Sequence, residues 1–208
     1  MMPLAALPVR QPVLRWMRWL FFVFGLAAIG WVGFAIVDAK IFQVREAQQF
    51  SAMEKHIAAS AHAPAAESQL TNASLELTAG ATLGRIEIAR IGVDAIVVEG
   101  TGSKWLRRAV GHISGTALPG SKGNVAIAGH RDTFFRALRD IHADDAITLT
   151  TLSGVFRYRV DSATVVDPGD TSVLTSGTQS TLTLITCYPF YFVGPAPERF
   201  VVRARLEP

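Results

Sequence analysis

Cys187 is the only cysteine in the chain and the natural starting point for any chemistry. One cysteine cannot form an intramolecular disulfide or a metal site built from several cysteines. Its chemistry is therefore nucleophilic, intermolecular or absent, and on composition alone a lone cysteine is most often a small buried hydrophobic residue. A free thiol has a pKa of about 8.5 and is mostly protonated at neutral pH, so a nucleophilic cysteine needs a neighbouring base or cation.

Arg199 is a candidate for such a neighbour, because it and Cys187 lie at the ends of segments that alternate like β-strands. In the first segment Leu182 and Leu184 share one face and Cys187 lies on the other. In the last segment the apolar residues also alternate, so its arginines point away from the core. These outward arginines are Arg199, Arg203 and Arg205. Antiparallel pairing of the two segments through the connection 188–198 would bring Arg199 near Cys187.

The elements that must position these residues are short strands separated by Gly, Pro, Asp and Ser turns. From about Thr82 onward the β-branched and apolar residues predict a domain that is nearly all β. The predicted strands are 83–88, 91–98, 124–128, 147–152, 155–160, 181–187 and 199–206. Only 105–110 and 133–138 resemble helical turns, so the pattern favours a closed or nearly closed barrel with short helical insertions.

A charge-free apolar segment at residues 19–37 precedes this domain. As a helix it would be roughly 28 Å long, close to the hydrocarbon thickness of a bilayer. Three arginines and no acidic residue precede it, which by the positive-inside rule predicts a cytoplasmic N-terminus and an extracytoplasmic catalytic domain. We therefore expect a cytoplasmic N-terminus (1–18), a single-pass transmembrane signal anchor (19–37), a stalk and flexible linker (38–81) and a catalytic domain (82–208). The alternative is a cleaved signal peptide, but the apolar segment is longer than the usual apolar region of such peptides.

Three motifs in the β region resemble the sortase family. Thr183-Leu184-Ile185-Thr186-Cys187 is similar to the signature pentapeptide of sortases, and Arg199, twelve positions on, lies where that family has its active-site arginine. Gly129-His130-Arg131, after the strand 124–128, resembles the family's catalytic histidine motif. The segments GHISGTALPG, GNVAIAGHRDTFFRAL and TLITCYPFYFVG resemble the class D branch in particular.

This resemblance implies an eight-stranded sortase-type β-barrel and a membrane-anchored cysteine transpeptidase. The substrates would be exported proteins with an LPxTG-like C-terminal sorting signal, and the acceptor an amine from a cell-wall precursor or another protein. Cys187 would be the nucleophile and His130 the group that takes and returns a proton. Arg199 would donate hydrogen bonds to the substrate carbonyl or the developing oxyanion.

Other functions are less consistent with the sequence. The formal charge of +3 comes from scattered basic residues, so nucleic acid is not an expected partner. HExxH, Walker A, GxGxxG and EF-hand patterns are missing, and we expect no metal and no cofactor.

An L,D-transpeptidase would need a Ser-His-Gly-Cys type motif, whereas Thr186 precedes Cys187. A membrane-tethered β-domain that binds a peptide or wall component without turnover remains an alternative. His112 and His142 could be structural, and His112 could line the groove or brace a loop.

Overall fold

The computed structural model describes residues 11–60, 78–192 and 194–207 of this chain. One long helix precedes a β domain that contains short helical segments. The helices are α1 (Gln11–Ser60) and α2 (Ser103–Leu106), with 3₁₀ turns η1 (Ala89–Ile91), η2 (Arg136–Asp140) and η3 (Thr171–Leu174). The strands are β1 (Thr82–Ile88), β2 (Val93–Glu99), β3 (Val110–His112), β4 (Asn124–Ala128), β5 (Ala146–Thr151), β6 (Gly154–Val166), β7 (Thr181–Tyr188) and β8 (Glu198–Leu206).

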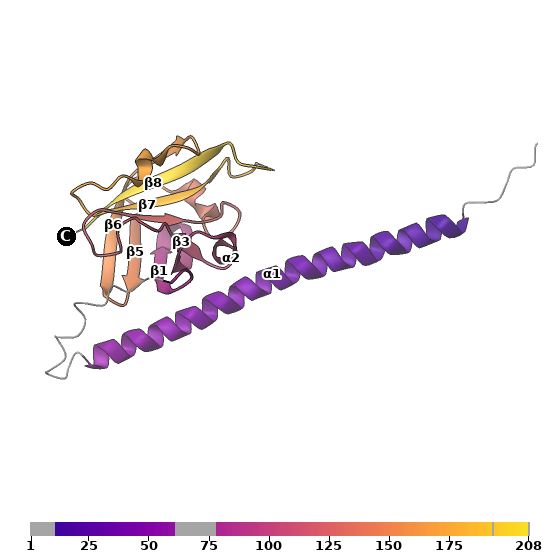
Figure 1. Ribbon diagram of the computed structural model, residues 1–208, viewed down its shortest axis with the longest axis horizontal. Coiled ribbons are helices and arrows are strands. Elements are labelled where there is room, and N and C mark those ends of the chain that lie inside the picture. The colour runs from indigo at the N-terminus through magenta and orange to yellow at the C-terminus, as the bar shows by residue number, and fades with distance from the viewer. Residues whose placement is uncertain (1–10, 61–77, 193, 208) are drawn as a thin grey trace, which may run out of the picture. The chain divides into compact units, whose positions relative to one another are not determined.

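The strands close into one barrel in the order β1-β2-β3-β4-β7-β8-β6-β5 (Figure 1). Most neighbours are antiparallel, but β2 pairs with β3, and β4 with β7, in parallel. The predicted fold class, a mainly β protein with a closed eight-stranded barrel, is thereby confirmed. For the site, the important part of this order is β4-β7-β8, because it places β4 next to the consecutive strands β7 and β8, which are distant from it in the sequence.

Side-chain alternation along β7 and β8 determines which residues enter the barrel. Leu182 and Leu184 of β7 are fully buried in the main core, where Val202 and Ala204 of β8 join them. Cys187 has the opposite parity in β7 and therefore lies on the outer face of the barrel. The alternation predicted from the sequence is confirmed at these positions.

Two elements differ from the sequence prediction. β3 starts at Val110, where a helical turn over 105–110 was expected, and the observed turn α2 ends at Leu106. With only three residues, β3 is too short to show an alternating pattern. β6 runs to Val166, beyond the predicted end at residue 160, because its second half pairs with β8 while its side chains stay mostly exposed.

The chain forms two compact units, Met1–Lys40 and Ile41–Pro208. In the first unit α1 is long and apolar enough to cross a bilayer, judged by length and composition. The helix continues to Ser60 through the first half of the predicted stalk. The rest of the predicted linker falls largely on residues 61–77, which lie outside the described residues.

Within the second unit, the segment 42–50 of α1 covers the outer face of β2. Phe42 and Ala47 pack against Ile96 and Val98, which point away from the main core. The side-chain amide of Gln43 donates to the carbonyl of Arg108 (2.6 Å) and accepts from the amide N–H of Ile96 (2.8 Å). Because β3 pairs with β2 only from Val97 onward, the N–H of Ile96 has no partner in β3, and Gln43 bonds it instead. A residue of α1 thus binds backbone groups of β2 and of the turn after α2.

Candidate active site

Cys187 and Arg199 lie directly opposite each other on neighbouring strands. They are register partners in the antiparallel pair of β7 and β8. Side chains at such positions have Cβ atoms about 5 Å apart and point to the same face of the sheet. Both residues are half-buried, so they face the outside of the barrel and are reachable by a substrate. The predicted proximity of this arginine to the cysteine is confirmed by the register.

The guanidinium group of Arg199 turns toward the connection that precedes β8. One terminal nitrogen donates to the carbonyls of Glu198 (3.0 Å) and Ala196 (3.4 Å). Within the described part of the chain, Arg199 has no carboxylate partner at ion-pair distance. Its other N–H groups remain available to an acyl oxygen, and its charge is permanent.

His130 comes to the site from the other side of β7. β4 runs parallel to β7, with Ala128 opposite Ile185, and the pairing extends by one bond from the N–H of Gly129 to the carbonyl of Ile185 (3.1 Å). His130 is two residues beyond Ala128, and Cys187 is two residues beyond Ile185. Equal offsets along a parallel pair bring the backbone of the histidine alongside that of the cysteine.

Gly129 and Thr186 hold this approach in place. The hydroxyl of Thr186, which is 2% exposed, donates to the carbonyl of Gly129 (2.7 Å). A side chain at Gly129 would meet the ring of the buried Phe135 at 2.7 Å, so only glycine fits here. After His130 the chain turns, and the N–H of Phe135 donates back to the carbonyl of His130 (3.1 Å). The backbone on both sides of the histidine is therefore fixed by hydrogen bonds.

One wall beside the outer face of β4 and β7 is the connection between β6 and β7. The amide of Asn124 donates to the carbonyl of Val173 in η3 (2.9 Å) and accepts from the hydroxyl of Thr183 (2.7 Å). These contacts hold η3 over the far end of the two strands. Between this cover and Cys187, the half-buried Ile185 and Ala128 form an apolar floor where an extended peptide could lie.

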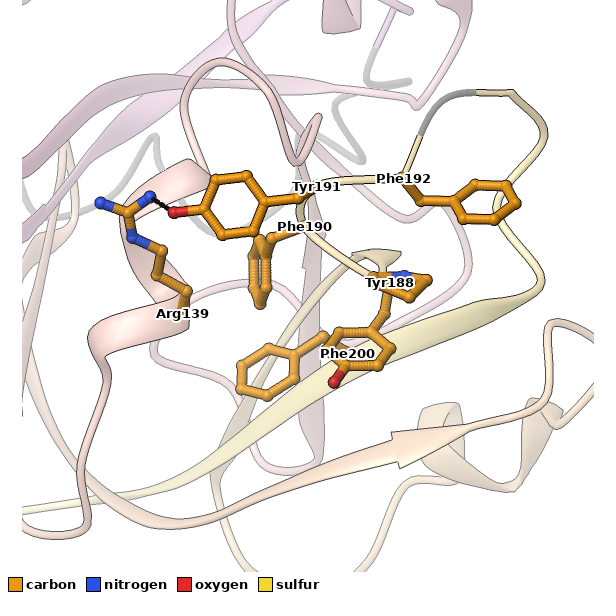
Figure 2. A pocket seen from close by; sticks show the side chains of 7 residues that line it. Arg139, Tyr188, Phe190, Tyr191, Phe192 and Phe200 are labelled. Atoms are coloured by element: carbon orange, nitrogen blue, oxygen red, sulfur yellow. Dashed lines mark hydrogen bonds between the residues drawn. The ribbon is translucent and has the colours of Figure 1, made fainter.

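An aromatic cluster lies where β7 ends and β8 begins (Figure 2). The rings of Tyr188 and Phe200 stack at 6.2 Å between centroids, and Phe190 meets Phe200 edge-on at 5.2 Å. With Arg139 and neighbouring loop residues they line a cavity of about 430 Å³. The hydroxyl of Tyr191 accepts a hydrogen bond from Arg139. Tyr188 and Phe200 point to the face opposite to that of the cysteine, because their parity in β7 and β8 is opposite to that of Cys187 and Arg199.

The other histidines of the β domain lie elsewhere. His112 is 2% exposed, and its Nδ1 lies 2.6 Å from a carboxylate oxygen of Glu99. Its Nε2 lies 3.0 Å from the carbonyl of Ala117, so His112 braces the loop between β3 and β4. The backbone N–H of His142 donates to the carboxylate of Asp145. Among the described residues, no three His, Cys, Asp or Glu side chains converge as metal ligands.

Comparison with known proteins agrees with this geometry. The family model for the sortase domain matches residues 86–207. The chain belongs to the sortase family. It is 33% identical to sortase D of Bacillus subtilis (strain 168) over 181 residues, which are 86% of this chain and 91% of that protein. It is thus a sortase-type cysteine transpeptidase.

Solved structures of sortases share its fold. A sortase D5 transpeptidase of Clostridium perfringens superposes with a TM-score of 0.63 at 28% identity, covering 81% of this chain and 98% of that structure. Sortase C-1 of Actinomyces oris superposes with a TM-score of 0.58 at 30% identity, covering 62% of this chain and 75% of that structure. Both the family and the class D resemblance inferred from the motifs are supported.

Proposed function

We propose that this sortase cleaves an LPxTG-like C-terminal sorting signal of exported proteins and transfers the resulting acyl group to an amine. The observation that carries the proposal is the position of Cys187 opposite Arg199, with His130 two residues beyond the end of the neighbouring parallel strand β4. The proposal is supported by the complementary chemistry of a thiol, an imidazole and a guanidinium group, and all three residues are half-buried. No metal or cofactor is required by this arrangement.

The first step would form a thioester. The sulfur of Cys187 attacks the scissile carbonyl while its proton passes to His130, and Arg199 donates hydrogen bonds to the developing oxyanion. The C–N bond then breaks, and His130 returns the proton to the departing amine. In the second step an incoming amine attacks the thioester carbonyl, the C–S bond breaks, and the proton that the amine loses returns to the thiol. Water in place of the amine gives hydrolysis.

The activity test uses the full-length chain in detergent micelles with a pool of LPxTG-like peptides and an added amine. Intact-mass analysis should show an acyl adduct on Cys187 and a ligated product. Cys187→Ala and His130→Ala should abolish both. Arg199→Lys keeps the charge but loses the planar donor fork, so it should lose most of the activity. Near-normal turnover of Arg199→Lys would contradict the role assigned to the arginine, and a folded, thiol-accessible protein without any adduct would favour a binding domain.

We further propose that residues 19–37 anchor the enzyme in the membrane as a single span, with the N-terminus in the cytoplasm and the catalytic domain outside. The support is the charge-free segment in α1 and the arginines that precede it. Because Cys187 is the only cysteine, a membrane-impermeant maleimide can report its side of the membrane. Labelling in right-side-out vesicles without detergent is expected, and labelling only after permeabilisation would contradict this orientation.

A further inference from the structure

Arg131 joins the segment after His130 to the connection between β7 and β8. Its guanidinium donates to the carbonyls of Pro189 (3.0 Å), Phe192 (2.7 Å) and Gly194 (3.1 Å). It also lies 5.9 Å from the centre of the Phe192 ring. Three carbonyls of one loop therefore converge on a single side chain, and the planar fork of arginine has enough donors to bind all three.

The rest of the connection is held by Phe190, which packs against Tyr188 and Phe200, and by Arg199, which donates to the carbonyls of Ala196 and Glu198. Among its described residues, the backbone hydrogen bond within the loop runs from the N–H of Phe192 to the carbonyl of Pro189 (3.3 Å). The exposed Tyr191 adds a contact of its side chain with Arg139. The carbonyls of a loop without strand pairing bond either to water or to side-chain partners. Arg131 supplies them at both ends of the segment Pro189 to Gly194.

The position of this loop matters because it begins two residues after the nucleophile. In the reaction proposed above, the acyl chain would lie along the outer faces of β7 and β4, which leaves the side where the strands end for the acceptor. The loop held by Arg131 borders that side. The segment carrying His130 borders it as well, and Arg131 is the next residue in the chain.

We infer that Arg131 is a positioning residue for the acceptor step of the transpeptidation proposed above. It fixes the β7–β8 connection against the histidine segment and so shapes the entrance through which the amine reaches the thioester. Thioester formation depends less on it, because the backbone before His130 is held separately by the bond from Thr186 to Gly129. Loss of Arg131 therefore impairs aminolysis more than acylation.

The test compares wild type with Arg131→Ala, Arg131→Lys and the control Arg136→Ala in the full-length protein. Arg136 is an exposed arginine five positions further on, and among the described residues its side chain makes no hydrogen bond or ion pair. Each variant is assayed for the rate of thioester formation, the KM for the amine, and the ratio of ligated to hydrolysed product. For Arg131→Ala we expect that ratio to fall roughly tenfold, with a smaller change in the acylation rate. Arg131→Lys keeps the charge but cannot reach three carbonyls, so it should resemble Arg131→Ala.

Hydrogen exchange of peptides covering 189–198 provides a readout that does not depend on activity. Faster exchange there in both Arg131 variants, but not in Arg136→Ala, is expected. Unchanged exchange would show that Arg131 does not hold the loop. A loosened loop with an unchanged product ratio would show that Arg131 has no role in the acceptor step. If Arg131→Ala does not fold, Arg131→Lys and Arg131→Gln carry the same comparison. Absence of ligation in the wild type would instead count against the proposed function. The exchange data would still test whether Arg131 holds the β7–β8 connection.

Discussion

Thr186→Val tests whether a buried hydroxyl positions the histidine. Valine keeps the shape of threonine, but the carbonyl of Gly129 loses the donor that lies 2.7 Å away in the wild type. An orphaned buried acceptor costs about 1–3 kcal/mol, so the free energy of unfolding should fall by that amount. The same carbonyl belongs to the residue before His130, and a displacement of about 1 Å at a reacting group can cost on the order of 100-fold in rate. We therefore expect the rate of thioester formation at saturating peptide to fall by about 10- to 100-fold.

The assay combines thermal unfolding with single-turnover acylation for wild type, Thr186→Val and Thr186→Ser. Serine retains the hydroxyl and should recover most of the rate. Thr183→Val serves as a matched control, because Thr183 is equally buried and donates a bond of the same 2.7 Å length to Asn124, away from the histidine. It should lose stability with much less effect on acylation. A Thr186→Val enzyme that is destabilised but acylates at the wild-type rate would refute the positioning argument.

Three further predictions concern the barrel. Gln43→Ala should lower the free energy of unfolding by about 2 kcal/mol, because two backbone groups lose their partner, whereas the exposed Gln49→Ala should have little effect in the same denaturant titration. The hydrogen bond from Arg90 lowers the pKa of Asp145 from its ordinary value of 3.8. This pair therefore stabilises the fold fully at pH values above the pKa of the unfolded state, and the stabilisation is lost as the pH falls through the lower pKa of the folded state. The stability difference between wild type and Asp145→Asn should therefore shrink in acid, and a pH-independent difference would contradict this. Burial raises the pKa of Tyr158 to about 12, so an ultraviolet titration of the folded protein should show one phenol ionising near that pH, absent in Tyr158→Phe.

The central part of the site could be predicted because a strand has only two faces. Once the segments ending at Cys187 and starting at Arg199 are recognised as strands, their apolar residues identify the buried face, and the other face must carry the cysteine and the arginine. Antiparallel pairing through one connection then brings the two together. The structure has them as direct partners. The neighbouring position of His130 required the family resemblance, since nothing in the local pattern reveals that β4 pairs in parallel with β7.

The residues that hold the site were not predicted, for a different reason. Thr186 and Arg131 both stand inside the quoted motifs, but their partners are backbone carbonyls. Every residue has such a carbonyl, so the sequence contains no complementary side chain that would indicate the contact. The same is true of Gln43, whose partners are the backbone groups of Ile96 and Arg108. Such contacts become visible only when the path of the chain is known.

The barrel order explains how the three proposed catalytic residues come close to one another. His130 follows β4, Cys187 lies near the end of β7 and Arg199 lies near the start of β8. These three strands are adjacent in the sheet, so closure of the barrel brings the backbones of the three residues together. What closure leaves open is the path of the chain beyond the strand ends. Thr186 fixes the chain just before the histidine, and Arg131 fixes the loop just after the cysteine. The Thr186 contact holds the residue before His130, so Thr186→Val should mainly slow acylation. The Arg131 contact holds the loop after Cys187, so Arg131→Ala should mainly change whether an amine or water accepts the acyl group.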